Sequence, residues 1–306
     1  MKGVKMKKKL IAVLAAALVI TGIPAVNGTV AYAKPKTKEY VEVSPTGIDY
    51  NGADFNNISY YTEAGGYHIK LQEGATYYIQ GQLRLNSNTY LEATGAKLIE
   101  TRPGSRIICQ PYDRKGYKKS KGFGSVHDIT IDGGTWVGTK KLADSNVNIK
   151  NGKKTGTNVI NFWHAKNITI KNLSVYNVYN AHIIELCGVK NAVIQNCHIG
   201  CRKVNGKLKK GFSTGDPLRG AIQLDFCSRS GNRDSKPFDN QTCQNVTIKN
   251  NYIWHRTAIQ IANDSPGKTK NVKVTGNTLR CKNKWVGNRM NKVTGFKSSK
   301  NKTVKY

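Results

Sequence analysis

The chain has 306 residues, and its 49 Lys and Arg residues outnumber its 18 Asp and Glu residues, so its formal charge is +31 at pH 7. A surface of this kind attracts polyanions and repels other copies of itself, which favours a monomer. The sequence contains no recognisable nucleic-acid-binding module, so nucleic acid is excluded as the expected polyanion. Acidic polysaccharides and cell-wall polyanions are the partners that we expect. A charged coat that serves only solubility is the alternative.

The first 33 residues have the pattern of a secretion signal. Lysines 2, 5 and 7–9 precede an apolar run, Leu10–Ile20, which is too short to span a bilayer. The segment Ala31–Ala33 has the small-x-small pattern that signal peptidase cleaves. We therefore expect residues 1–33 to be removed and residues 34–306 to be secreted as one domain without stable membrane insertion, retained electrostatically at a Gram-positive cell wall if at all. A retained N-terminal anchor is the alternative.

A 24-residue repeat runs through the middle of the chain. Its first two copies read NVINFWHAKNITIKNLSVYN from Asn158 and HIIELCGVKNAVIQNCHIG from His182. Related copies begin at His127, Gln244 and Lys270. Each copy alternates apolar and polar residues, as strands with one buried face do, and a recurrence of this length is typical of stacked structural repeats. The pattern predicts an all-β fold, a right-handed, single-stranded parallel β-helix of about eight to ten coils.

Other segments fit the same fold. Residues Asp54–Gly66 form the best helix candidate, and a helix there would cap the open N-terminal end of the solenoid. The segments 67–85, 88–100 and 105–110 are expected to form three shorter coils. Asn172, Asn196 and Asn250, followed by Gly276, recur at one position of the repeat. Because Asn and Gly tolerate positive φ, we expect them to stack at one corner.

Two insertions, Cys201–Leu218 and Cys227–Asn240, flank the single strand Gly220–Phe226. Insertions on one face of a solenoid often form the walls of a binding cleft. The strand between them is therefore the predicted floor of a site.

Two polar columns cross that floor in the 24-residue register. The first contains Asn161, Glu185, Gln223 and Gln260, and the second contains Trp163, Cys187, Asp225 and Ala262. Apolar residues alternate with both columns and take the interior, so we expect both columns to face solvent.

Glu185 and Asp225 are the predicted catalytic pair, assisted by His182 at the strand entrance. One strand spacing of ~4.8 Å and two residues of rise place their Cα atoms roughly 8 Å apart. Inverting glycosidases hold two carboxyl groups about 6.5–9.5 Å apart, with room for a water molecule. The alternative interpretation is two solvated carboxylates on a very basic surface.

The remaining candidates are substrate-binding groups around this pair. Trp163 is expected to stack on a sugar ring, and amides and charged groups to bind hydroxyl or carboxylate groups of a polysaccharide. The full predicted substrate-binding set is Asn161, Trp163, Arg219, Gln223, Asp239, His255, Arg256 and Gln260. No cofactor is expected, and calcium has no clear site in the pattern.

The seven cysteines cannot all pair within one chain. Cys197 aligns with Leu173 in the repeat and is expected to point into the core. Cys227 and Cys243 bracket the second insertion. They either form a disulfide or remain two free thiols, and the sequence leaves both alternatives open.

The repeats, with phrases such as NITIKNLSVYN and NVTIKNNYI, resemble the pectin-lyase-like right-handed β-helix superfamily. The segments HIIELCGVKNAVIQNCHI and AIQLDF more narrowly resemble secreted Gram-positive β-helix proteins related to glycoside hydrolase family 28. The resemblance covers roughly residues 50–295 and implies action on polysaccharides, commonly acidic ones. The polygalacturonase signatures and the pectate-lyase calcium-binding aspartates are absent, so no catalytic residue is carried over.

Three functions compete. A hydrolase would cleave a uronate-containing polysaccharide with Glu185 and Asp225 as acid and base. A lyase would take its base and its cation from residues such as His182, His255, Arg256 and Arg219. A non-catalytic carbohydrate-binding or adhesion protein would need only the basic surface and aromatic platforms.

Overall fold

The computed structural model describes residues 35–46, 53–100, 108–109, 120–138, 159–178, 182–211, 220–230, 234–261, 267–285 and 293–306. By its internal contacts the chain divides into Met1–Ala31 and Tyr32–Tyr306, and all described residues lie in the second unit. The predicted signal peptide, residues 1–33, lies outside the described residues. Within the described ranges, no helix is long and apolar enough to cross a membrane.

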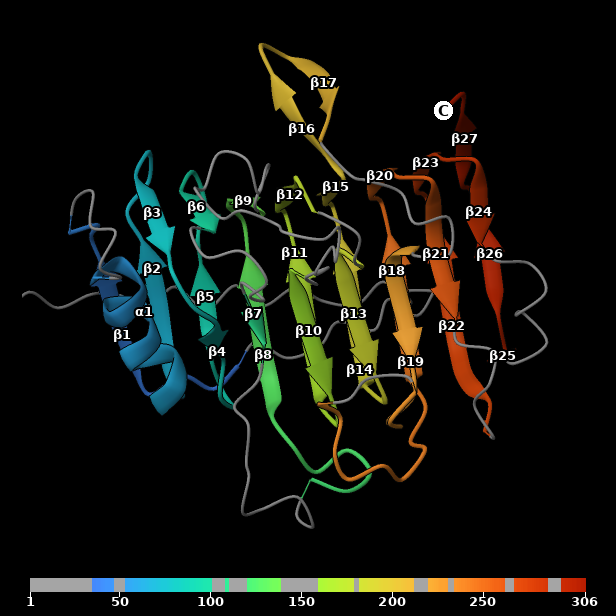
Figure 1. Cartoon of the computed structure of the whole chain (residues 1–306), viewed down its shortest axis with the longest axis horizontal. Helices are drawn as coiled ribbons and strands as arrows, with labels where there is room; N and C mark the ends of the chain where they lie inside the picture. The colour runs from blue at the N-terminus through green and yellow to red at the C-terminus, as the bar shows by residue number, and fades with distance from the viewer. Residues whose placement is uncertain are drawn as a thin grey trace, which may run out of the picture. The chain divides into compact units, whose positions relative to one another are not determined.

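The second unit is a parallel β-helix, which confirms the predicted fold (Figure 1). Its coils contribute strands to three parallel sheets, here named A, B and C. Sheet A has 10 strands: β1 (Glu39–Val43), β2 (Tyr67–Leu71), β5 (Tyr90–Glu92), β8 (His127–Asp132), β11 (Lys166–Lys171), β14 (Lys190–Gln195), β19 (Gln244–Lys249), β22 (Thr269–Thr275), β25 (Val293–Thr294) and β26 (Lys297–Ser299).

Sheet B has 8 strands: β3 (Thr76–Ile79), β6 (Lys97–Glu100), β9 (Thr135–Val137), β12 (Ser174–Tyr176), β15 (His198–Ile199), β20 (Tyr252–Trp254), β23 (Thr278–Arg280) and β27 (Lys302–Val304). Sheet C has 7 strands: β4 (Leu83–Arg84), β7 (Ile108–Cys109), β10 (Ile160–Trp163), β13 (Ile184–Cys187), β18 (Gly220–Asp225), β21 (Thr257–Ile261) and β24 (Asn283–Trp285). The described residues therefore form seven coils with a strand in every sheet, and β1 at one end and β25, β26 and β27 at the other add partial coils, in keeping with the prediction of about eight to ten. The early segment 105–110 is not a separate coil, because β7 within it is the sheet C strand of the second coil.

The core is a stack of aliphatic side chains that point inward from each coil. In sheet A, Ile129, Ile168, Ala192, Val246 and Val272 occupy matching positions of successive strands, and all five are buried. Each coil therefore buries its apolar face only against its neighbours, as stacked repeats do.

The predicted asparagine corner is confirmed. Asn172, Asn196 and Asn250 have φ values of 60°, 57° and 56°, and the amide of Asn196 donates to Asn172 Oδ1 at 3.4 Å. Gly276 continues the column with φ of 66°, and a Cβ there would lie 2.4 Å from Asn250 Oδ1. Only glycine fits that position without a shift.

The predicted capping helix is confirmed with slightly different bounds, as α1 (Ala53–Ala64). It packs against β2, β3 and β4 of the first coil and buries Ile58. Asp54 near its start is buried and accepts hydrogen bonds from the backbone N–H of Thr46 at 2.8 Å and of Tyr78 at 3.0 Å. The helix thus covers the apolar interior of the first coil.

The two insertions differ from each other. The first begins with an antiparallel hairpin, β16 (Cys201–Val204) and β17 (Lys207–Lys210), which extends beyond the coils (Figure 1); residues 212–219 lie outside the described residues. The second leaves Cys227 and Cys243 as free, buried thiols, so of the two alternatives left open by the sequence the structure has the unpaired one. Cys197 is buried, as predicted.

Candidate functional site

Four neighbouring strands of sheet C carry the predicted polar columns in the predicted register. Asn161 of β10 pairs with Glu185 of β13, which pairs with Gln223 of β18, which pairs with Gln260 of β21. Asp225 pairs with Cys187, two residues further along the same strands. We call the set Asn161, Glu185, Gln223, Asp225 and Gln260 the polar row.

The prediction that these columns face solvent is wrong. Glu185 is 4% exposed and Asp225 is 7% exposed, and the other members of the polar row are also buried. Their side chains alternate with core residues such as Ile184 and Leu186 and so point away from the aliphatic core, yet they are shielded from solvent. The periodicity of the strands cannot predict this burial, because it gives only the face of the sheet on which a side chain lies.

The polar row is internally hydrogen-bonded. The amide nitrogen of Asn161 donates to Glu185 Oε2, and the Cys187 thiol lies 3.7 Å from Glu185 Oε1 as its donor. Gln223 Nε2 donates to Asp225 Oδ2 at 3.2 Å, and the N–H of Phe226 donates to Asp225 Oδ1 at 2.8 Å. Among the described residues, Gln223 Oε1 is buried without a hydrogen-bond partner. Both carboxylates are therefore held by neighbouring groups.

Cys187 lies between the two carboxylates. Its burial, reinforced by the negative charges of Glu185 and Asp225, raises the pKa of its thiol well above the usual value. The thiol therefore stays protonated and serves as a hydrogen-bond donor rather than as a nucleophile.

Trp163 does not present its ring to solvent. It is 3% exposed and packs against Cys187 and Cys227 in a small apolar cluster. The predicted sugar-stacking role requires an accessible ring face, so the structure contradicts it.

His182, His255 and Arg256 lie just before the sheet C strands β13 and β21. His182 precedes β13 and approaches Gly220 O with its Nδ1 at 2.9 Å, while His255 approaches Thr257 O at 3.0 Å. Burial lowers the pKa of His255 to about 4, so this ring is neutral at pH 7 and cannot supply the predicted positive charge. Arg256 is half-buried, and its Nε has no hydrogen-bond partner among the described residues. Arg219 lies outside the described residues.

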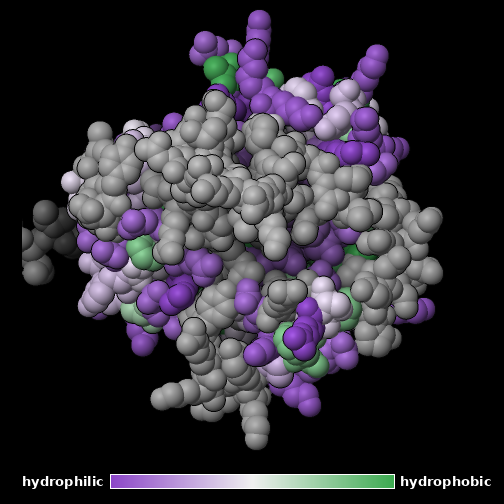
Figure 2. Space-filling model, viewed as in Figure 1, coloured by the Kyte–Doolittle hydropathy of each residue, from purple (hydrophilic) through white to green (hydrophobic). Residues whose placement is uncertain are grey.

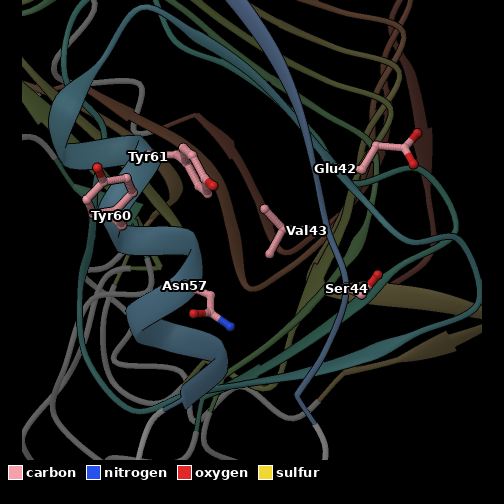
Figure 3. A pocket seen from close by; sticks show the side chains of 6 residues that line it. All are labelled: Glu42, Val43, Ser44, Asn57, Tyr60 and Tyr61. Atoms are coloured by element: carbon pink, nitrogen blue, oxygen red, sulfur yellow. The ribbon is translucent and has the colours of Figure 1, made fainter.

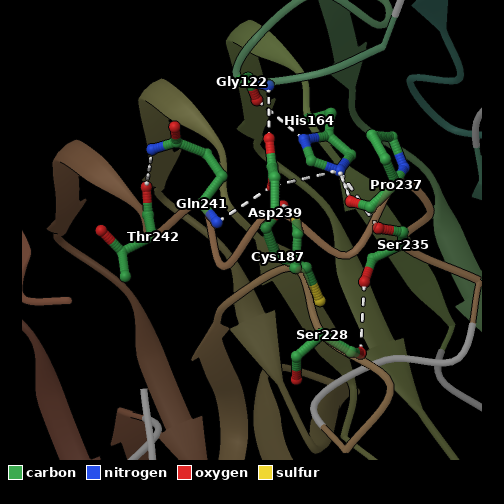
Figure 4. Close-up of polar contacts among 10 residues, drawn as sticks. Gly122, His164, Cys187, Ser228, Ser235, Pro237, Asp239, Gln241 and Thr242 are labelled. Carbon is green, nitrogen blue, oxygen red and sulfur yellow. Dashed lines mark hydrogen bonds and ion pairs between the residues drawn. The ribbon is translucent and has the colours of Figure 1, made fainter. Parts of the chain in front are cut away.

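Asp239 belongs to a separate cluster beyond the carboxyl ends of the same strands (Figure 4). Its Oδ2 accepts from the N–H of Gly122 at 2.7 Å, and its Oδ1 accepts from the N–H of Gln241 at 3.1 Å. Oδ1 also lies 3.8 Å from Nε2 of His164, a fully buried residue.

Sequence reasoning missed His164. Its φ is 52°, in the left-handed region, where the next coil has Gly188 at 55°. A histidine in a corner position that the following repeat gives to glycine was the available signal, since non-glycine residues are uncommon at positive φ.

A separate pocket lies at the N-terminal cap, well away in the chain from the polar row. Its volume is about 250 Å³, and Figure 3 shows its lining from α1 and from the end of β1, namely Glu42, Val43, Ser44, Asn57, Tyr60 and Tyr61. It contains no member of the predicted site.

Comparisons with known proteins agree on the fold. No family model matches the chain. Plasmin and fibronectin-binding protein A of Streptococcus pneumoniae (strain ATCC BAA-255 / R6) is 26% identical over 197 residues, which are 62% of this chain and 26% of that protein. A crystal structure of PfbA, described as a surface adhesin of Streptococcus pneumoniae, matches 73% of this chain and 53% of its own with a TM-score of 0.57 at 22% identity.

A second PfbA structure matches with a TM-score of 0.54 at 21% identity, over 73% of this chain and 56% of its own. The chain therefore shares the parallel β-helix fold of these structures. It spans about a quarter of the streptococcal protein and about half of the crystallised chains.

Proposed function

We propose that the protein is an extracellular, adhesin-like binding protein that holds an acidic, uronate-containing polysaccharide on its basic outer surface. The observation that carries the proposal is the basic hairpin β16–β17. Arg202, Lys203, Lys207, Lys209 and Lys210 are all exposed along its 10 residues, and the hairpin contains no acid.

The base of the hairpin is fixed by aromatic rings. The Arg202 guanidinium lies 4.9 Å from the centre of the Tyr176 ring and donates to its hydroxyl at 2.9 Å. Lys210 Nζ lies 4.3 Å from the centre of the Tyr306 ring and donates to its hydroxyl at 2.8 Å. Cation–π contacts of this kind orient the hairpin without neutralising its charge.

The C-terminal coils also carry an excess of positive charge. From residue 240 onward the chain has fourteen Lys and Arg residues and one acid, Asp264. Among the described residues, no Lys or Arg of the hairpin or of the coils after residue 240 forms an ion pair with an acid; the pairs seen involve Lys70, Arg84 and Lys171 elsewhere in the chain. The positive charges of the hairpin and of the C-terminal coils are therefore available to a polyanion.

The local potential also affects a neighbouring histidine. Burial and, after it, the charge of Lys203 lower the pKa of His198. A histidine that resists protonation next to exposed lysines is the response expected beside an unpaired positive patch.

The buried state of Glu185 and Asp225 argues against a surface catalytic pair. A polysaccharide chain cannot contact carboxylates that are 4% and 7% exposed unless the covering segments move. The likeness to a surface adhesin at 22% identity supports the fold and is compatible with a binding role. On the face shown in Figure 2, the described side chains are mostly hydrophilic, with hydrophobic ones scattered among them.

The test is binding to polygalacturonate, measured by calorimetry at several salt concentrations. Reversing three hairpin charges, by Lys203→Glu, Lys207→Glu and Lys209→Glu together, should weaken binding at least about tenfold, since charge complementarity drives it. The matched control reverses Lys36, Lys38 and Lys166, which are also exposed, so the net charge is the same in both variants. Equal loss in the two variants would mean that the hairpin is not the binding surface.

A second candidate function is polysaccharide cleavage at the polar row. The observation in its favour is Gln223 Oε1, a buried acceptor beside two carboxylates that has no hydrogen-bond partner in the described part of the chain. A substrate hydroxyl could donate a hydrogen bond to Gln223 Oε1 if the residues that bury it moved aside. Reducing ends that appear with the wild type and are lost in Glu185→Gln would establish this activity, and ultraviolet-absorbing unsaturated products would indicate a lyase.

A further inference from the structure

The fully buried ring of His164 has oxygen atoms at both of its nitrogens. Nδ1 lies 2.8 Å from Gly122 O, while Nε2 lies 3.1 Å from Ser235 O and 2.9 Å from Pro237 O. A neutral imidazole has one N–H, so either tautomer would direct a nitrogen lone pair at a carbonyl oxygen. One of the two ring nitrogens therefore has its lone pair facing a carbonyl oxygen, an arrangement that a cation bound to that nitrogen would relieve.

Two further ligand groups converge on the same place. A ring nitrogen of His164, the Cys227 Sγ and a carboxylate oxygen of Asp239 all lie within 4.8 Å of one another. Zn²⁺ bonds of about 2.0–2.3 Å place the ligand atoms of a tetrahedral site roughly 3.3–3.8 Å apart. A contraction of about 1 Å around an ion would complete that geometry.

The outer contacts are those that metal ligands usually make. A metal-bound histidine donates its other N–H to a carbonyl or carboxylate, and a ligating carboxylate is itself hydrogen-bonded. Here Nδ1 faces Gly122 O, and Asp239 accepts from the N–H groups of Gly122 and Gln241. These contacts leave Nε2 as the metal-binding nitrogen.

The charges also balance for a divalent ion. Zn²⁺ with a neutral His164, a Cys227 thiolate and an Asp239 carboxylate forms a neutral group, which suits a buried position. The Cys227 thiol would release its proton to solvent as the metal binds. Cys227 and His164 are buried, and Asp239 is partly buried.

We propose that His164, Cys227 and Asp239 form a structural site for Zn²⁺ or a similar divalent ion. The fourth position faces the carbonyl oxygens of Ser235 and Pro237 (Figure 4). The ion connects the corner after β10 with the second insertion, and the Gly122 loop is joined through its contacts to both ligands. It thereby holds the second insertion in place next to the polar row.

The test begins with tag-free protein stripped by a chelator and titrated with Co²⁺ and with Zn²⁺. One equivalent of Co²⁺ should bind and give the near-ultraviolet absorption of a thiolate ligand, and Zn²⁺ should displace it. Cys227→Ser is nearly isosteric and should abolish this absorption. Cys201→Ser, at another buried free cysteine, is the matched control and should leave it unchanged.

Two further measurements keep the proposal testable if a variant is unstable. His164→Gln and Asp239→Asn should each weaken Zn²⁺ binding at least about tenfold, with the fold checked by circular dichroism. Added Zn²⁺ should slow proteolysis within residues 227–242 of the wild type at least severalfold, but not in Cys227→Ser.

Two results would contradict the proposed metal site. No stoichiometric Co²⁺ binding by the wild type, with NMR showing both His164 nitrogens protonated, would assign the cation to a proton and overturn the metal site. A thiolate absorption that persists in Cys227→Ser would also overturn it.

Discussion

The side-chain amide of Asn161 donates to the Glu185 carboxylate of the next coil, and both side chains are buried. This contact joins two coils through a charged group inside the protein. The Glu185 carboxylate accepts hydrogen bonds from an amide and a thiol, and it stabilises the stacked coils only while these donors remain.

Removing the Glu185 side chain should therefore destabilise the fold. Glu185→Ala removes the charged acceptor of the Asn161 amide and creates a cavity, so it should lower the free energy of unfolding by about 3 kcal/mol. Glu185→Gln keeps the shape and one acceptor and should cost about 1 kcal/mol. Urea unfolding followed by circular dichroism measures both. Equal stability of Glu185→Ala and the wild type would mean that the contact contributes nothing.

A second ladder of asparagines should respond to backbone conformation as well as to hydrogen bonding. Asn191 has a φ of 57°, donates to Asn167 Oδ1 at 3.0 Å and accepts from Asn245 Nδ2 at 2.9 Å. Asn191→Ala loses the ladder and strains the backbone, at a cost of about 2–3 kcal/mol. Asn191→Gly loses the ladder alone and should cost about 1 kcal/mol. Thermal unfolding that ranks glycine below alanine would contradict this account.

His255 should make stability depend on acid pH. Its pKa falls from 6.5 to about 4 on folding, chiefly because the ring is buried. The unfolded state therefore binds the proton first, so the contribution is complete above pH 6.5 and is lost as the pH falls toward 4. The loss is about 3 kcal/mol.

His255→Asn keeps a donor for Thr257 O and removes the titration. Unfolding in urea between pH 7 and pH 4 should show a shallower pH dependence for this variant than for the wild type. Parallel curves would exclude His255 as the source.

The buried thiols should be unreactive in the folded protein. Burial raises the pKa values of Cys201 and Cys243 to about 12, so at pH 8 only about one molecule in ten thousand carries either thiolate. Iodoacetamide should leave both unlabelled until urea is added, as read by peptide mass spectrometry. A peptide in which Cys227 and Cys243 are joined would contradict the free thiols of this structure.

The sequence was sufficient to predict the pairing register of the strands and the residues at the corners of the coils. The 24-residue repeat placed Asn161 beside Glu185 and put Asn172 over Asn196, because strand pairing and positive φ are local properties of each coil. It could not predict the burial of Glu185, because strand alternation gives only the face of the sheet on which a side chain lies. It could not predict the burial of Trp163, because Cys227, which packs against it, belongs to the non-repetitive second insertion. His164 was missed for the same reason: its partners Gly122, Pro237 and Asp239 are distant in sequence and follow no period.

The central claim is that the protein binds an acidic polysaccharide and does not cleave it. The most direct measurement is one incubation of the purified chain with polygalacturonate, with bound polymer, reducing ends and ultraviolet-absorbing products followed together. The account predicts binding that weakens as salt is added, because salt screens the exposed lysines, with neither product accumulating. Steady release of reducing ends or unsaturated sugar, lost in Glu185→Gln, would contradict it.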